Sequence, residues 1–338
     1  MEIWILATFA AAAVQTFRFM LQKHLRGTGL STAGATFSRF LFAAPLAAAL
    51  VAVLLRSTGQ EMPGMPTAFW AYALAGGIGQ IGGTLCTVAL FGLRNFAVGI
   101  AFTKTETVQV ALFSAVVLGE AVTGPGFAAI LLGLVGVILL SLPAEGLRGG
   151  VLNRAMALGL LGGAAFGVSA IGYRGAALSL TEGHFFFRAA LTLAAVTAMQ
   201  TVIMAGLLAW REPGEIRRVL SAWRVTALVG LTGMLGSLGW FTAFTLQNAA
   251  YVRAVGQVEL VFSMLAASLA FGEKITRREV GGIIALMASN VMLVLVTCEG
   301  CRPAGGTGFP RRRCERRAPF RGLPAGAGRR RPRPARPR

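Results

Sequence analysis

The stretch "LRNFAVGIAFTKTETVQVALFSAVVLGE", residues 93–120, has a second copy later in the chain. A shift of 153 residues places it, without a gap, over "LQNAAYVRAVGQVELVFSMLAASLAFGE" at residues 246–273. Hydrophobic composition alone would match leucine and alanine, but not charged, amide and tryptophan residues. The informative identities are Glu106 with Glu259, Asn95 with Asn248, Gly119 with Gly272, Glu120 with Glu273, Trp70 with Trp223 and Thr123 with Thr276. We therefore infer an internal repeat.

The composition is that of a membrane protein. Of the 338 residues, 55% are hydrophobic and 13% are charged, the mean hydropathy is +0.67, and aspartate is absent. Apolar segments of roughly 18 to 25 residues recur between short polar breaks, long enough to cross a ~30 Å hydrocarbon core. The ten predicted spans cover residues 2–21, 31–55, 68–91, 96–118, 124–142, 154–174, 184–209, 222–245, 249–271 and 279–297.

Five of these spans fall in each copy of the repeat. Because five is odd, the second copy must enter the membrane upside down relative to the first, a recurrent plan of secondary transporters. We predict an all-α polytopic membrane protein, with ten transmembrane helices in two inverted five-helix repeats around a central cavity. The predicted parts are residues 1–148, residues 149–298 and a disordered tail, residues 299–338, which holds 13 Arg, seven Pro and seven Gly.

The 5+5 plan and the ends of the fourth and ninth spans resemble the EamA-type members of the drug/metabolite transporter superfamily. These ends read "LGE" at 118–120 and "FGE" at 271–273. The resemblance covers about residues 1–297. It implies a basket of spans one to four and six to nine around the cavity, with spans five and ten behind, and export or exchange of small metabolites. Where the family often has a proline in the fourth and ninth spans, this chain has Thr107 and Leu260 nearby.

Glu106 lies within a long apolar stretch, where a carboxylate costs several kcal/mol unless it has a partner or a function. On a continuous helix, Thr103 and Gln109 fall within about 60° of Glu106, whereas Lys104 is ~160° away. A similar stripe surrounds Glu259 in the second copy, so both stripes predict cavity lining. The predicted substrate and coupling residues are Thr103, Lys104, Glu106, Gln109, Glu259 and Ser263, together with Arg39 and Arg188.

Three roles are open for Glu106 and Glu259. They exchange protons and couple transport to the proton gradient, they contact the substrate or pair with a basic residue, or they only pack between helices. The candidate basic partners are Arg39, Lys104, Arg188 and Arg253. If these and Arg18 face inward, the cavity is net positive and suits an anionic or zwitterionic metabolite such as an amino acid. Snorkelling to the headgroups is the alternative for the arginines.

The remaining motif residues are predicted to be structural. Glu120 and Glu273 end their helices at the membrane edge, where each caps the following helix together with a threonine three residues on. Asn95 and Asn248 mark the membrane edge, and Gly119 and Gly272 complete the repeated motif.

The expected partners are a small-molecule substrate, protons if transport is coupled, and the lipid bilayer of the plasma (bacterial inner) membrane. The basic tail is expected to contact anionic lipids, and nucleic acid is not expected. No cofactor or metal is expected, since Cys298 and Cys301 form a lone C-x-x-C. A membrane enzyme would need a cluster of catalytic polar residues at membrane depth. The sequence contains no such cluster, so no catalytic residue is predicted. The alternative function is a non-transporting scaffold or sensor that acts through its tail.

The distribution of basic residues predicts the orientation. With ten spans, both termini lie on one side, and the loops of the opposite side carry most of the Lys and Arg residues. The positive-inside rule then places both termini outside. The thirteen arginines of the tail favour the reverse orientation.

Overall fold

The computed structural model of the chain describes residues 2–59, 61–106, 109, 124–141, 154–247 and 249–299. The predictions for Gly119, Glu120 and Asn248, and for the tail beyond residue 299, lie outside the described residues. Met1–Val296 form one structural unit, to which every contact below belongs.

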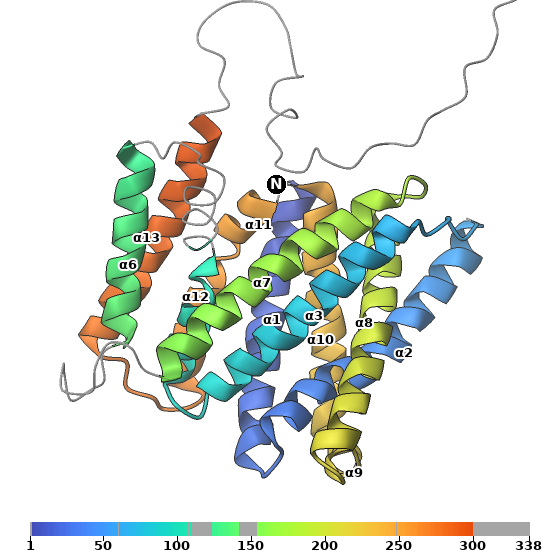
Figure 1. The fold of residues 1–338 in the computed structure, drawn as a ribbon, viewed down its shortest axis with the longest axis horizontal. Coiled ribbons are helices and arrows are strands. Elements are labelled where there is room, and N and C mark those ends of the chain that lie inside the picture. The colour runs from blue at the N-terminus through green and yellow to red at the C-terminus, as the bar shows by residue number, and fades with distance from the viewer. Residues whose placement is uncertain are drawn as a thin grey trace, which may run out of the picture. The chain divides into compact units, whose positions relative to one another are not determined.

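The described residues form helices at the positions of the predicted spans (Figure 1). By length and composition, six of them can cross a membrane: α1 (Ile3–Gly27), α2 (Thr32–Thr58), α3 (Thr67–Leu90), α7 (Arg154–Ser179), α8 (Phe185–Arg211) and α10 (Trp223–Leu246). The others are α4 (Phe96–Thr103), α6 (Gly124–Ser141), α9 (Glu215–Ser221), α11 (Ala249–Val255), α12 (Val258–Leu269) and α13 (Arg277–Glu299). This is the pattern of a polytopic membrane protein.

The prediction of continuous fourth and ninth spans is wrong. The ninth is interrupted at Gly256 and Gln257, between α11 and α12. Glycine is a poor helix former, and here the Trp240 ring occupies the place of its side chain, since an added Cβ would lie 2.7 Å from a ring carbon. The fourth span is interrupted at Lys104 and Thr105, directly after α4.

Side chains satisfy the backbone groups freed at the break after α4. Thr103 Oγ1 donates to Ile100 O (2.7 Å), and Thr105 Oγ1 donates to Phe102 O (2.8 Å). Asn290 of α13, fully buried, donates from Nδ2 to Lys104 O (3.0 Å). An irregular backbone is tolerated at membrane depth only where such partners replace the helical hydrogen bonds.

Helices from the two halves of the chain pack against each other. α3 packs along α7, α1 along α10, and α2 along α8, and α3 and α7 run side by side in Figure 1. The backbones of α3 and α7 approach closely because a glycine, Gly79, stands at the contact: an added Cβ there would lie 2.6 Å from Ala165 O. These pairs join the first span to the eighth, the third to the sixth and the second to the seventh. A two-fold relation between two five-helix repeats, which stays a prediction, would produce this pattern.

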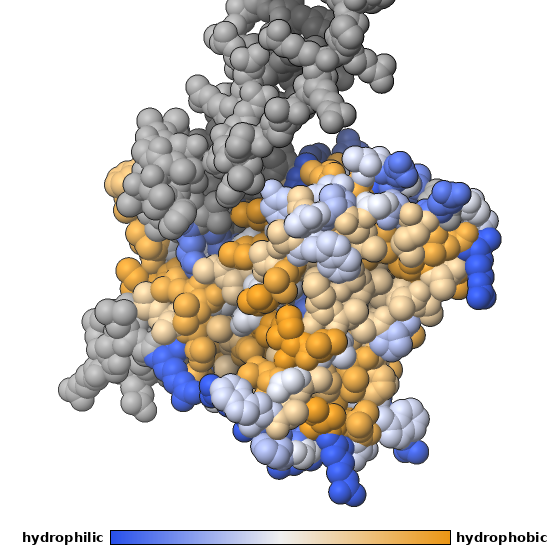
Figure 2. All heavy atoms as spheres, turned by 45° about the vertical axis from the view of Figure 1, so that its right-hand side comes forward, coloured by the Kyte–Doolittle hydropathy of each residue, from blue (hydrophilic) through white to orange (hydrophobic). Residues whose placement is uncertain are grey.

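The outer surface is apolar, as a lipid-facing surface must be. Figure 2 shows a broad apolar band across one face, with hydrophilic residues above and below it. Large apolar side chains are strongly exposed, among them Leu269 (81%), Val202 (73%) and Leu161 (63%). Such exposure is rare on soluble proteins and is favourable in lipid. The chain is an integral membrane protein.

Basic residues collect at the end where α1, α3 and α8 end and α2, α10 and α13 begin. Hydrogen bonds tie this end together: Ser31 N donates to Glu215 Oε1 (2.6 Å), and Asn95 Nδ2 donates to Lys274 O (3.2 Å). We call it the basic end; its basic residues are Lys23, Arg26, Arg94, Arg154, Arg211, Arg217, Arg218, Arg224, Lys274, Arg277 and Arg278.

Candidate functional site

The two helix breaks place the two repeated glutamates in equivalent local positions. Glu106 follows the break at Lys104 and Thr105, and Glu259 lies in the first turn of α12, after the break at Gly256 and Gln257. Both side chains are buried, with residue exposures of 6% and 1%. Discontinuous helices at membrane depth recur where transporters form their binding sites.

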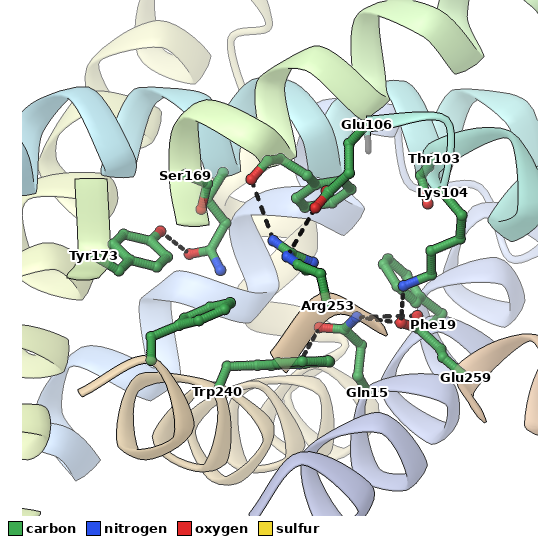
Figure 3. Close-up of a pocket in the computed structure, with 13 residues that line it drawn as sticks. Gln15, Phe19, Thr103, Lys104, Glu106, Ser169, Tyr173, Trp240, Arg253 and Glu259 are labelled. Atoms are coloured by element: carbon green, nitrogen blue, oxygen red, sulfur yellow. Dashed lines mark hydrogen bonds and ion pairs between the residues drawn. The ribbon is translucent and has the colours of Figure 1, made fainter. Parts of the chain in front are cut away.

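Glu259 pairs with the first break. Lys104 Nζ donates to Glu259 Oε2, and both side chains are buried (Figure 3). Gln15 of α1 donates from Nε2 to both carboxylate oxygens, each at 3.0 Å. The orientation of Gln15 is fixed in turn, because Trp240 Nε1 donates to Gln15 Oε1 (3.1 Å).

Glu106 pairs with α11. Arg253 Nε lies 2.9 Å from Glu106 Oε1, and Arg253 Nη2 donates to Phe166 O (3.2 Å). The guanidinium carbon lies 5.4 Å and 5.3 Å from the ring centres of Trp240 and Phe244, within cation–π range. Each half of the chain thus contributes one glutamate and one cation, and each ion pair joins the two halves.

The rest of the pocket is neutral and aromatic. Tyr173 OH donates to Gln80 Oε1 (2.6 Å), which also accepts a hydrogen bond from Gln200 Nε2 (2.9 Å). The cavity in this pocket has a volume of about 20 Å³, which is close to the minimum that holds one water molecule. The ion pairs and rings therefore nearly fill the pocket. Its lining residues are Gln15, Phe19, Gln80, Thr103, Lys104, Glu106, Phe166, Ser169, Tyr173, Trp240, Phe244, Arg253 and Glu259.

The pocket lies between two apolar clusters of buried residues. One cluster, toward the basic end, includes Phe37, Phe40 and Phe96, and the other, toward the opposite end, includes Phe69 and Phe187. The four residues of the two ion pairs, Lys104, Glu106, Arg253 and Glu259, all line this pocket.

The structure brings four of the eight predicted substrate and coupling residues into the pocket: Thr103, Lys104, Glu106 and Glu259. Lys104 was expected about 160° from Glu106, on the opposite face of a continuous helix. The helix break turns it into the pocket instead, because the residues before and after the break no longer share one helical phase. The lining carries two cations and two carboxylates, so the expected net positive charge is not a property of the lining itself.

The other four predicted residues do not line the pocket. Gln109 donates from Nε2 to Thr105 Oγ1 (2.8 Å) and so supports the break. Ser263 donates to Leu260 O (2.8 Å) in its own helix, α12. Arg188 donates from Nη1 to Leu180 O (2.9 Å), just after α7. Arg39 is buried, with 2% exposure, and is not among the lining residues.

The motif at the basic end has a different role from the predicted one. Glu273 does not cap the following helix; it accepts a hydrogen bond from Phe96 N (2.7 Å), at the start of α4, and pairs with Lys23 of α1. A capping box begins α13 instead: Thr276 N donates to Glu279 Oε2 (2.9 Å), and Glu279 N donates to Thr276 Oγ1 (3.2 Å). Asn95 contacts the Lys274 carbonyl, as described above. Gly272 has φ +60°, which suits a residue without a side chain.

Gln15, Trp240 and Asn290 were not predicted as functional residues. Gln15 was detectable in principle, because it is a polar residue within an apolar span. The same signal marks Asn290, a polar residue within the predicted span 279–297, whereas Trp240 has no such signal because its role depends on which helices meet.

A polytopic membrane protein with a buried, charged pocket at two helix breaks has an architecture that recurs at the binding sites of membrane transporters. Comparison with known families names the class more closely: residues 153–295 match the model of the EamA-like transporter family. Residues 153–295 therefore carry a domain of this family, which is part of the drug/metabolite transporter superfamily, and over these residues the resemblance seen in the sequence is confirmed.

Comparisons with individual proteins add the fold alone. No curated protein matches the chain significantly. A solved crystal structure, described only as that of a protein, shares 18% identity and a TM-score of 0.53, over 88% of this chain and 99% of its own. At this identity the likeness extends to the fold and not to a substrate.

Proposed function

We propose that the protein is a secondary active transporter, an exporter or exchanger, of small organic metabolites in the plasma (bacterial inner) membrane. Zwitterionic molecules such as amino acids are its favoured substrates. The observation that supports this most directly is the pair of reciprocal ion pairs, Lys104–Glu259 and Arg253–Glu106, in an aromatic pocket.

The need to keep each buried charge paired favours a zwitterionic substrate over a singly charged one. Separating Lys104 from Glu259 inside the protein leaves two buried charges, each of which is costly without a partner. A zwitterion supplies a carboxylate to the lysine and an ammonium group to the glutamate, so both charges stay paired. A simple anion compensates only the lysine. The aromatic rings around the pocket suit the apolar part of the substrate.

The mechanism we propose is alternating access, in which the ion pairs break and re-form. Because each pair joins the two halves of the chain, movement of one half against the other separates the partners. Substrate charges stabilise the separated state. The two apolar clusters on either side of the pocket act as the alternating seals.

Proton coupling belongs to the same proposal. A buried glutamate separated from its cation is stabilised by taking up a proton. Glu106 and Glu259 can therefore carry protons in the state in which no substrate replaces their partners.

The test is a metabolite profile of cells and medium with and without expression of the protein. The matched control is the double variant Lys104→Met/Glu259→Gln, checked for equal abundance in the membrane. The proposal expects one or more zwitterionic metabolites to change in the medium with the unmodified protein and not with the variant. Identical profiles for the unmodified protein and the empty vector under metabolite loading would contradict it.

A further inference from the structure

Two arginines are buried deep in the membrane-spanning part of the chain. Arg18 of α1 and Arg39 of α2 are only 1% and 2% exposed. Both side chains pass over Gly233 of α10, where an added Cβ would lie 2.9 Å from Arg39 Cγ and 3.5 Å from Arg18 Cδ. The absence of a side chain at this glycine leaves the space in which the two cationic side chains meet.

The hydrogen-bond partners of both guanidinium groups are neutral. Arg39 donates from Nη1 to Thr84 Oγ1 (3.0 Å) and from Nη2 to Ser237 Oγ (2.9 Å). Arg18 donates from Nη1 to Gln22 Oε1 (2.6 Å). Its Nη2 is buried and has no hydrogen-bond partner in the part of the chain that the structure describes. One strong donor is therefore unused in a site where unused donors are costly.

The charge of the two arginines is also uncompensated. Each ion pair of the pocket is neutral in itself, because one cation faces one carboxylate. No ion pair within the described ranges joins Arg18 or Arg39 to a carboxylate. Glu259 attracts Arg18 through space, but its carboxylate already accepts hydrogen bonds within the pocket. Two buried positive charges without a counterion favour the binding of an anion.

The arginine pair lies next to the pocket, on the side of the basic end. α1 and α3 run toward the basic end, and α10 runs away from it. On α3 and α10 a residue of the arginine cluster stands about one turn closer to the basic end than a pocket residue, Thr84 after Gln80 and Ser237 before Trp240. On α1, Arg18 stands between the pocket residues Gln15 and Phe19. A molecule that moves between the basic end and the pocket along these helices passes the two arginines.

We propose that Arg18 and Arg39 form a second anion-binding site between the pocket and the basic end, which binds a carboxylate group of the transported molecule. This inference rests on the proposed transport of zwitterionic metabolites. Guanidinium groups bind carboxylates through paired, charge-assisted hydrogen bonds, and Arg18 Nη2 supplies an unused donor. The site selects molecules that carry a carboxylate before they reach the ion pairs.

Thermal unfolding of the purified full-length protein in detergent tests the site without a known substrate. The probes are sodium acetate and sodium chloride, compared at constant ionic strength. Acetate is expected to raise the unfolding temperature of the unmodified protein by at least about 2 °C, because a ligand of the folded state stabilises it. An equal rise with chloride would identify an inorganic-anion site and overturn the carboxylate assignment, and no rise with acetate would overturn the site.

Variants assign the acetate effect to the two arginines. Arg18→Gln and Arg39→Gln are expected to lose the acetate-dependent rise, whereas Arg188→Gln, the control, keeps it. Arg188 lies half-buried at the opposite end and donates to a backbone carbonyl. A full acetate effect in Arg18→Gln would contradict the proposal. If a glutamine variant does not fold, Arg18→Lys still decides the question, because it keeps the charge but cannot form paired hydrogen bonds with a carboxylate. The acetate-dependent rise must then be smaller in Arg18→Lys than in the unmodified protein.

A transport measurement separates this inference from the proposed function. In proteoliposomes with a mixture of proteinogenic amino acids, Arg18→Gln should raise KM about tenfold, or about 1.4 kcal/mol. If no amino acid is carried but acetate stabilises the protein through Arg18, the proposed function fails and the anion site stands. If amino acids are carried with an unchanged KM in the variant, the function stands and this inference fails.

Discussion

Glu106 and Glu259 stand within two residues after breaks in two helices, and each is paired with a cation from the other half of the chain. Lys104, from the first break, binds Glu259, and Arg253, from the helix before the second break, binds Glu106. The two glutamates occupy equivalent positions in the repeat, but the two cations do not. Lys104 lies two residues before Glu106 in its own copy, whereas Arg253 lies six residues before Glu259. The two ion pairs are therefore not equivalent, and we expect them to differ in how easily they break.

The Lys104–Glu259 pair should be costly to break and inexpensive to remove. Lys104→Met leaves a buried carboxylate without its cation, and we expect a loss of about 3–5 kcal/mol in the free energy of unfolding. The double variant Lys104→Met/Glu259→Gln removes both charges and should recover most of this loss. The measurement is thermal unfolding in detergent for both single variants and the double variant. Additive losses in the double variant would mean that the two charges do not stabilise each other.

Proton coupling predicts a change in the pH dependence of transport. Glu106→Gln and Glu259→Gln cannot release a proton at these positions, so their flux should no longer vary with pH between about 5 and 8 if both glutamates carry protons. The measurement is uptake into proteoliposomes with and without an imposed proton gradient. Unchanged pH dependence in both folded variants rules out coupling through these residues, and loss of flux at every pH indicates substrate contact instead.

Asn290 should influence the pocket through the helix break. Its side chain donates to the Lys104 carbonyl, so Asn290→Ala leaves this backbone group without a partner and loosens the position of the lysine. The neighbouring Ser289 is equally buried but donates to Ala129 O (2.6 Å), which makes Ser289→Ala a matched control. Both variants should lose about 1 kcal/mol of stability. Only Asn290→Ala should also raise KM in a transport assay; equal KM values for the two would contradict the role of the break.

Orientation can be measured with two reporter fusions, one at Val296 and one after Arg338. The basic end of the structure gathers the residues that the positive-inside rule places in the cytoplasm, so the fusion at Val296 should lie outside and show phosphatase activity. Cytoplasmic fluorescence at both sites would support the opposite orientation. Different answers at the two sites would show that the predicted number of spans is wrong.

The helices were predictable from the sequence because lipid imposes a simple length and polarity rule on each span. The glutamates were predictable for the same reason, since a charge at membrane depth requires compensation. The break at Lys104 was not, because residues 103–105 are stabilised there by hydrogen bonds that include one from Asn290, far along the chain. Continuous helical geometry consequently placed Lys104 on the wrong face. Partners such as Gln15 and Trp240 depend on helix packing, which no local pattern encodes.

The proposed substrate class can be tested by exchange across a membrane. Proteoliposomes with the reconstituted protein, loaded with a mixture of amino acids and of lipophilic cations, are diluted into buffer, and mass spectrometry follows the release of each compound. We predict that the unmodified protein and Lys274→Gln, an exposed control at the basic end, release zwitterions faster than empty liposomes do. The folded Lys104→Met/Glu259→Gln variant should lose this activity at least about tenfold. Release of lipophilic cations alone, or equal release of zwitterions by the double variant, would contradict transport through the ion-pair pocket.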